Sequence, residues 1–326
     1  MPKYGNYKLV SGTHNRPYKK HTYPLFRSFD EFCKAYPDET ACEKALYDAR
    51  WGKGFVCPKC GITGPCYKLK SRPLYVCSAC RKQSSVLSGT AIEGTRLPLT
   101  KWFRAFYLFS SDKRGFSSIA LASILQVQQK TAWYMIRRIQ QAMSARDERY
   151  MLSGCVQIDN CYVGSPTVGK KRGVGTEKTN VFIAVSKEMG DGAMYCHMKA
   201  KVISNTTSKK VVDFAKRYIS SDATIRSDDN KAYAALADEG FKITQKPVKH
   251  KTGQNANYLN YIDHAVSNLK AMILGTYHGL PAECLQGYID AYCYRFNRRY
   301  YGGFMTERLL TAVCECPPEH RYARSA

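Results

Sequence analysis

The sequence is poor in acidic residues and contains no long apolar run. Its 326 residues include 26 Asp and Glu against 50 Lys and Arg, which leaves a formal net charge of +24 at pH 7. We find no apolar stretch long enough to cross a membrane, no isolated basic amphipathic helix at a terminus and no signal-peptide core at the start. These absences favour a cytosolic protein with an affinity for polyanions, and nucleic acid is the first candidate.

A disulfide framework and a repeat architecture are also disfavoured. The 14 cysteines belong to a long chain without an export signal, whereas disulfide scaffolds are small and secreted, so thiols or metal sites are expected. Internal repeats and low-complexity segments are not evident. With 44% hydrophobic residues the chain can bury a core, and its length suits two or three domains.

Two CxxC motifs, Cys57 to Cys60 and Cys77 to Cys80, are separated by 16 residues. Each motif forms a turn that directs two sulfurs at one ion, and together they complete a tetrahedron, which predicts a zinc ribbon. Four thiolates leave no open coordination position, so the Zn²⁺ should be structural. Cys66 lies between the motifs without a partner at CxxC spacing and is left out of the predicted ligands.

Residues 116–143 carry two apolar patterns separated by a short polar break, which predicts a helix-turn-helix. The apolar residues fall at Ile119, Leu121, Ile124 and Leu125, and then at Ala132, Met135, Ile136 and Ile139. The second helix should begin near Gln129. Lys130 and Thr131 would then reach bases and phosphates, with Arg137 and Arg138 on the exposed side. A generic helical hairpin gives the same pattern, but the charge and the neighbouring cysteine motifs favour DNA binding.

Three acidic residues mark a predicted catalytic domain. Asp159 lies in an apolar strand at 156–163, Asp228 follows a strand at 224–226, and Asp263 lies on a helix at 261–274 that also carries Lys270 on the same face. Strands at 181–186 and 195–202 and a helix at 209–219 come between them. This order predicts an α/β domain with a ribonuclease-H-like mixed sheet flanked by helices, in which the first and fourth strands are neighbours.

Converging carboxylates repel one another unless a cation neutralises them. Oxygen ligands of this kind suit Mg²⁺ or Mn²⁺, and two such ions would serve in-line displacement at phosphorus. Asp229 competes with Asp228 for the second position, and Asp228 is preferred because it follows the strand directly. The segment from Gly164 to Lys170 nearly forms a phosphate-binding loop, but Lys171 stands where Ser or Thr is required. Lys170, Lys171 and Arg172 are therefore predicted to form a basic loop near DNA.

At this point the sequence resembles the transposases of bacterial insertion sequences that carry an N-terminal zinc ribbon and an ISXO-like DDE domain. The likeness runs from about Asp38 to Arg299. It rests on the motifs RWG (50–52), GT (89–90), LPLTKWF (97–103), KTAW (130–133), IDNCYVG (158–164), GTEKT (175–179), SDDNKAY (227–233), LNYID (259–263) with Lys270, and YRFNRR (294–299).

The resemblance implies a metal-dependent DNA transposase in which Asp159, Asp228 and Asp263 hold the catalytic ions and Lys270 contacts DNA near the reacting phosphate. The family often has Glu or Asn where this chain has Asp263, and commonly has Glu where it has Asn160. The usual His-Val-Asn before the last motif reads Tyr-Leu-Asn, which retains Asn260 as a predicted DNA contact. Its partners would be the element's terminal inverted repeats and target DNA, bound by a homodimer or larger assembly.

Three functional hypotheses remain open at the level of sequence. The first is a transposase that cleaves and joins DNA, the second a domesticated and catalytically weak DNA-binding regulator, and the third a nuclease that cleaves without joining. Four segments are expected: a basic arm and short helices (1–50), a zinc ribbon (51–95), a helix-turn-helix region (96–150) and the catalytic domain (151–326). For the arm, residues 1 to about 25, a DNA contact and a plain disordered tail are both open.

Overall fold

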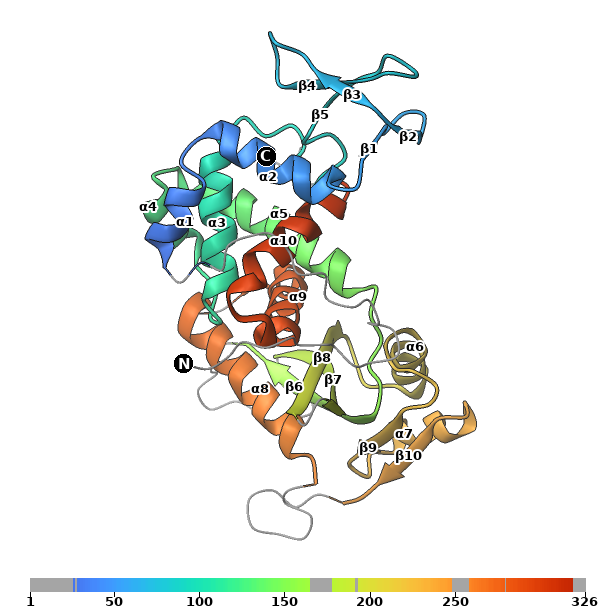
Figure 1. The fold of residues 1–326 in the computed structure, drawn as a ribbon. Coiled ribbons are helices and arrows are strands. Elements are labelled where there is room, and N and C mark those ends of the chain that lie inside the picture. Colours follow the sequence, from blue (N-terminus) through green and yellow to red (C-terminus); the bar gives the residue numbers. More distant parts are fainter. Residues whose placement is uncertain are drawn as a thin grey trace. The chain divides into compact units, whose positions relative to one another are not determined.

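The computed structural model describes Phe26 and residues 28–164, 178–190, 193–247, 258–278 and 280–318 (Figure 1). These residues divide into two compact units. One contains residues 147–300, and the other contains residues 22–146 together with the C-terminal segment from residue 301. The predicted arm, as well as Lys170, Lys171 and Arg172, lies outside the described residues.

Helices form the core of the unit that contains the N-terminal half of the chain. They are α1 (Phe29–Ala35), α2 (Glu39–Trp51), α3 (Leu99–Ser111), α4 (Ser118–Leu125), α5 (Gln129–Asp147), whose last residue belongs to the other unit, and α10 (Met305–Glu315). Pro37 separates α1 from α2, and Gly115 lies between α3 and α4 with φ 75°, as the sequence predicts. Pro98 gives α3 no side-chain cap. Instead the Glu39 carboxylate accepts the N–H groups of Leu99 and Thr100, at 2.8 and 3.0 Å.

The ribbon consists of five short strands within the same unit: β1 (Phe55–Val56), β2 (Thr63–Gly64), β3 (Cys66–Lys68), β4 (Leu74–Cys77) and β5 (Gln83–Ser85). Trp51 is buried and packs its ring on Phe55 and Tyr75, with centroids 4.7 and 5.6 Å apart. Arg50 donates to the carbonyl oxygen of Val86 at 2.8 Å. The RWG motif thus ties α2 to the ribbon.

A mixed sheet of five strands organises the other unit, in the order β10-β9-β6-β7-β8. The elements are β6 (Cys155–Val163), β7 (Thr179–Gly190), β8 (Ala193–Ile203), α6 (Ser208–Tyr218), β9 (Thr224–Ser227), α7 (Lys231–Asp238) and β10 (Lys242–Gln245). β7 is antiparallel to β6 and β8, whereas β9 is parallel to both β6 and β10. The predicted pairing of the first and fourth strands is therefore observed, while β10 was not predicted.

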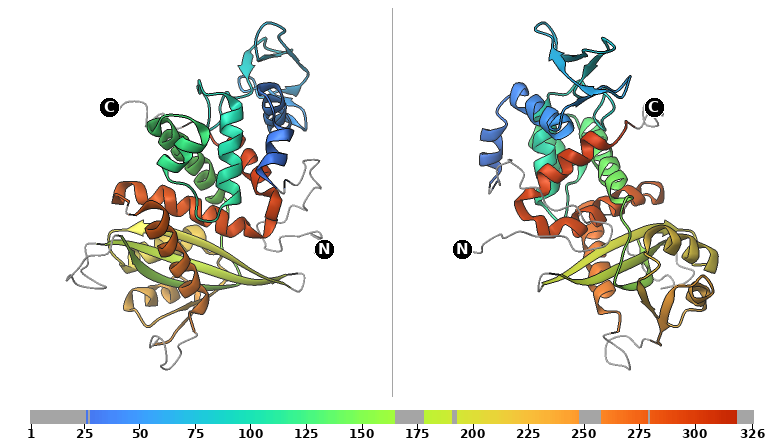
Figure 2. Two further views of the ribbon diagram at one scale, coloured as in Figure 1. Left: turned by 90° about the vertical axis from the view of Figure 1, so that its left-hand side faces the viewer. Right: turned by 45° about the vertical axis from the view of Figure 1, so that its right-hand side comes forward.

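Helices cover both faces of this sheet (Figure 2). On one face, Val156 and Ile158 of β6 pack with apolar residues of α6 and α7. On the other face, Cys161 and Val163 pack with α8 (Asn260–Met272), with the π-helical turn Ile273–Tyr277 and with α9 (Ala282–Arg298). A 3₁₀ segment, Arg299–Phe304, follows α9. The alternation along β6 decides which face each polar residue joins.

The outer edge of β8 is closed by two polar side chains of α9. Asn297 accepts from the N–H of Met198 at 2.6 Å and donates to the Met198 carbonyl oxygen at 2.9 Å. Gln286 makes the same pair of bonds with the N–H of Val202 and the carbonyl oxygen of Ala200, at 2.7 and 3.2 Å. These bonds satisfy N–H and carbonyl groups of β8 that could otherwise pair with another strand.

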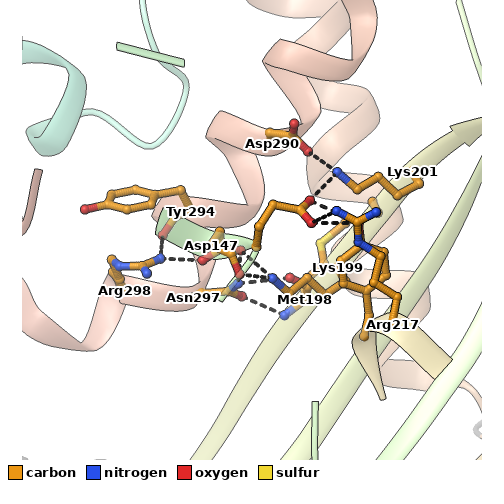
Figure 3. Close-up of polar contacts among 12 residues, drawn as sticks. Asp147, Met198, Lys199, Lys201, Arg217, Asp290, Tyr294, Asn297 and Arg298 are labelled. Carbon is orange, nitrogen blue, oxygen red and sulfur yellow. Dashed lines mark hydrogen bonds and ion pairs between the residues drawn. The ribbon is translucent and has the colours of Figure 1, made fainter. Parts of the chain in front are cut away.

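A buried charge network fixes Asp147, the last residue of α5, within this unit (Figure 3). Arg298 lies 2.6 Å and Lys199 lies 3.5 Å from the Asp147 carboxylate, which also accepts from Asn297 at 2.9 Å. Burial alone would raise the pKa of Asp147, but the two cations outweigh it and hold the pKa below its usual range. The YRFNRR motif therefore supplies Asn297 and Arg298 to the fold, away from the predicted acidic site.

Candidate zinc site, acidic site and nucleic-acid interface

The four predicted zinc ligands lie together. The sulfur atoms of Cys57, Cys60, Cys77 and Cys80 all lie within 4.8 Å of one another, and among the described residues they are the only such group of His, Cys, Asp or Glu. Backbone N–H groups of Cys60 and Lys59 lower the pKa of the Cys57 thiol to about 6, which favours the thiolate that binds metal. Cys66 is not part of the group.

The two cysteine turns share one backbone geometry. In the first, Gly61 donates to the carbonyl oxygen of Cys57 at 2.9 Å and has φ 70°. In the second, Arg81 donates to the carbonyl oxygen of Cys77 at 3.0 Å and has φ 59°. Glycine adopts this left-handed conformation without steric cost, whereas arginine does not. Because Gly61 and Arg81 adopt the same conformation, the zinc site requires this turn geometry and not a particular residue type at that position.

Asp159 and Asp228 come from neighbouring parallel strands. Gln157 of β6 pairs with Arg226 of β9, so the same register continued by two residues puts Asp159 beside Asp228. Both aspartates are half-buried. Burial raises the pKa of the Tyr233 hydroxyl, and the charges of Asp159 and Asp228 raise it further, which places both carboxylates near one phenol group. Asp229 is exposed.

Asp159 faces the side of the sheet that α8 covers. It shares this face with Cys161, whose pKa burial raises to about 12 and on which the charges of Lys270 and Asp159 both act. Asp263 and Lys270 share one flank of α8, seven residues apart, and Asp263 is exposed. Asp159 and α8, which carries Asp263 and Lys270, thus lie on one side of the sheet. The three carboxylates do not form a group within 4.8 Å among the described residues.

A buried glutamine of β6 anchors the start of α8, and the sequence patterns did not single it out. The Gln157 side chain accepts from the N–H groups of Tyr261 and Ile262 at 3.1 Å and donates to the Tyr258 carbonyl oxygen at 3.0 Å. The helix has no side-chain cap of its own. Gln157 therefore supplies the cap and fixes this end of α8, including Asn260, next to the strand that carries Asp159. Its signal in the sequence is an amide between two apolar residues, Val156 and Ile158.

The predicted hairpin of helices forms, with differences in its exposed face. α4 and α5 are joined by residues 126–128, and α5 begins at Gln129 as predicted. Lys130 is exposed and Thr131 is partly buried. Ile119 and Ile124 were expected inside but are 68% and 45% exposed, because the short helix α4 packs only through the residues on its other side.

The predicted exposure of Arg138 is also wrong. Its guanidinium is half-buried, donates to the carbonyl oxygen of Ala91 at 2.5 Å and bonds the Tyr134 hydroxyl. Arg137 is half-buried too, and it donates to Gln140 at 3.1 Å. The acceptor is a backbone carbonyl oxygen of the segment that follows the ribbon. The apolar pattern of α5 alone does not reveal such an acceptor, so it could not predict that Arg138 turns inward.

Two domain families match this chain. A transposase zinc-ribbon domain matches residues 37–83, and an ISXO2-like transposase domain matches residues 151–297. The chain belongs to the insertion-sequence transposases that combine these domains. A relative from Halobacterium salinarum, described as an uncharacterized protein in transposable element ISH50, is 26% identical over 280 residues, which cover 79% of this chain and 91% of the relative. The resemblance stated from sequence motifs is confirmed.

The matched ranges fit the observed elements of this transposase family member. The first includes α2 and all four clustered cysteines, and the second runs from just before β6 nearly to the end of α9. Among solved structures, the Mos1 strand transfer complex matches 62% of this chain and 74% of its own, with 11% identity and a TM-score of 0.21, too low to support a comparison of folds. In the described ranges, every helix is too short or too polar to cross a bilayer.

Proposed function

We propose that this transposase binds the terminal inverted repeats of its element, hydrolyses a phosphodiester to free a 3′-hydroxyl, and joins that hydroxyl to target DNA. The observation that carries the proposal is the parallel pairing of β6, which carries Asp159, with β9, which Asp228 follows directly. The strand order and directions support a ribonuclease-H-like domain. Two element ends must be cut together, which supports a dimer or larger assembly on DNA.

The acidic residues suit divalent metal ions in their chemistry. Asp159, Asp228 and Asp263 would hold two Mg²⁺ or Mn²⁺ ions, which, when bound, would activate the attacking oxygen and stabilise the leaving one. Asp263 on the exposed flank of α8 can turn toward the sheet without leaving a buried partner. Lys270 provides a positive charge on the same flank for a phosphate of the bound DNA. Water is the first nucleophile, and no covalent protein intermediate is required.

The ribbon is proposed to hold DNA through its charge, with a structural Zn²⁺ keeping its fold. Residues 49–92 contain eight Lys and Arg and no Asp or Glu. Seven of the eight, all except Arg50, have exposed side chains. A surface of one sign suits contacts to phosphates without base specificity. The four thiolates leave no coordination position for a substrate.

The hairpin α4–α5 is proposed to act as the helix-turn-helix, with Lys130 and Thr131 at the start of α5 nearest the DNA. Arg137 and Arg138 are less suited to this role because both are partly buried and donate hydrogen bonds within the protein. Lys170, Lys171 and Arg172 remain predicted contacts of a basic loop. Asn260 remains predicted to contact DNA from the first turn of α8.

Strand transfer with purified protein tests the proposal. DNA carrying the element's ends and Mg²⁺ should yield joined products with the wild-type chain and none with Asp159→Ala or Asp228→Ala. Asp229→Ala is the matched control, because it removes a neighbouring carboxylate that is exposed, and it should retain joining. Joining that survives the first two substitutions contradicts the proposal, and joining lost only in Asp229→Ala moves the second ligand to that residue.

A regulator that binds DNA without cutting it is the second candidate. The exposure of Asp263 and the separation of the three carboxylates favour it. It predicts tight, salt-sensitive binding to the element's ends with no cleavage at any Mg²⁺ or Mn²⁺ concentration. A nuclease that cleaves without joining would be recognised by cut ends that never appear in joined products.

A further inference from the structure

The two acids lie beyond the last paired residues between β6 and β9, although β6 stays paired with β7 past Asp159. The pairing of β6 with β9 ends at Gln157 and Arg226, two residues before Asp159 and Asp228. The backbone hydrogen bonds of this pair therefore do not set the separation of the two carboxylates. Side-chain contacts past the end of this pairing contribute to that separation.

A chain of hydrogen bonds crosses the sheet at this level. The Tyr233 hydroxyl of α7 donates to Asn160 Oδ1 at 3.3 Å. Asn160 Nδ2 donates to Asn180 Oδ1 at 3.3 Å, and Asn180 Nδ2 donates to Thr206 Oγ1 at 3.1 Å. The chain connects α7, β6, β7 and the segment before α6. This chain of hydrogen bonds lies on the sheet face opposite to Asp159. It includes Asn160, the residue that follows Asp159.

The loop that carries Asp228 is attached to the same helix. Asp228 Oδ1 accepts from the N–H of Asn230 at 3.2 Å, and Asn230 caps α7 by accepting from the N–H of Ala232 at 3.0 Å. Gln245 of β10 donates to the carbonyl oxygens of Asp228 and Asn230, both at 3.1 Å. Asp228 is thus attached to the N-terminus of α7. Tyr233, whose side chain is fully buried, lies in the first turn of the same helix.

We propose that Tyr233 and Asn160 are positioning residues that hold Asp159 and Asp228 at the separation a divalent cation bridges. The inference rests on the proposed function, because it assumes that these aspartates bind metal. Asn160 suits the role because its amide accepts from Tyr233 and donates to Asn180 at once. A carboxylate at residue 160 accepts but does not donate, so it would break the chain toward β7.

Binding of Mn²⁺ to the full-length, zinc-loaded protein without DNA, followed by electron paramagnetic resonance, tests this without an activity assay. Tyr233→Phe keeps the ring in the core and should weaken Mn²⁺ binding about fivefold, the consequence of one lost hydrogen bond. Tyr218→Phe is the matched control. It removes a hydroxyl from the same buried cluster, where the partner is Glu148, and should change binding less than about twofold.

A double-mutant cycle separates positioning from a general loss of stability. Asn160→Ala should weaken Mn²⁺ binding at least as much, and the double variant should bind no more weakly than Asn160→Ala alone, because that variant already lacks the contact with Tyr233. Additive effects, or binding by Tyr233→Phe equal to the wild type, overturn the positioning role. Mn²⁺ binding unchanged in Asp159→Ala overturns the metal site itself, and with it the proposed function, which is a distinguishable result.

Discussion

Glu307 provides the sharpest test of the buried electrostatics. It lies in the first turn of α10, only 7% exposed, and both of its carboxylate oxygens are buried with no hydrogen-bond partner among the described residues. It lines a small cavity with Tyr36, Phe103, Phe106, Thr306 and Leu310. Burial raises the pKa of Glu307 to about 7, and its own backbone N–H and the charge of Arg308 offset this only in part.

The raised pKa fixes the direction of the pH dependence. The folded protein holds the Glu307 proton more tightly than the unfolded chain, where the pKa has its ordinary value of 4.5. Between pH 4.5 and about 7 the unfolded state releases this proton first, so the free energy of unfolding falls as the pH rises. At 1.36 kcal/mol per pKa unit, the loss across this window is about 3 kcal/mol. Below and above the window, this group contributes no slope.

Glu307→Gln keeps the shape of the protonated acid and removes the titration. We expect the variant to match the wild type near pH 4 and to be more stable by about 3 kcal/mol at pH 8, which corresponds to a Tm increase of roughly 6–12 °C for a unit of about 150 residues. Thermal unfolding of both proteins at the two pH values measures this. Glu31→Gln, an exposed carboxylate of the same unit, should show no such pH-dependent gain. A variant that is no more stable than the wild type at pH 8 refutes the reasoning.

Three further predictions concern the charge network and the ribbon. Arg298→Leu leaves Asp147 buried without its nearest cation and should cost about 3–5 kcal/mol in urea unfolding, of which Asp147→Asn in the same chain should restore part. Removal of Zn²⁺ by a chelator, or Cys77→Ser, should unfold the ribbon, seen as fast hydrogen exchange confined to residues 55–85. Arg81→Gly relieves a left-handed φ of 59° and should stabilise the zinc-bound ribbon by about 0.5–1 kcal/mol, whereas Lys82→Gly should not.

The parts of the fold that depend on local pattern could be predicted from the sequence. Strand β6 and the helices on either side of Pro37 follow from apolar spacing and from the backbone limits of proline. The zinc site follows from CxxC spacing because the geometry of the ion leaves few alternatives. The parallel pairing of β6 with β9, which leads toward Asp159 and Asp228, followed from the order of elements, which limits how the strands can be arranged.

What could not be predicted depends on tertiary contacts. The four residues of β10, Lys-Ile-Thr-Gln, carry a single apolar side chain, and they form a strand only because β9 offers a free edge. Ile119 and Ile124 repeat the apolar spacing of a buried helix, yet the short helix α4 buries Leu121 and Leu125 instead. The inward turn of Arg138 depends on where the carbonyl oxygen of Ala91 lies.

The placement of the acidic site follows from one strand. Along β6, Gln157 and Asp159 point to the same face, while Ile158 and Asn160 point to the other. Gln157 fixes the start of α8, which carries Asp263 and Lys270, whereas Asn160 binds α7, which begins just after Asp228. Within four consecutive residues of β6, Gln157 thus binds α8 and Asn160 binds α7, on opposite faces of the sheet. Because the pleat allows only two directions, a one-residue shift of β6 would exchange these partners, so its register determines whether the three aspartates share a side at all.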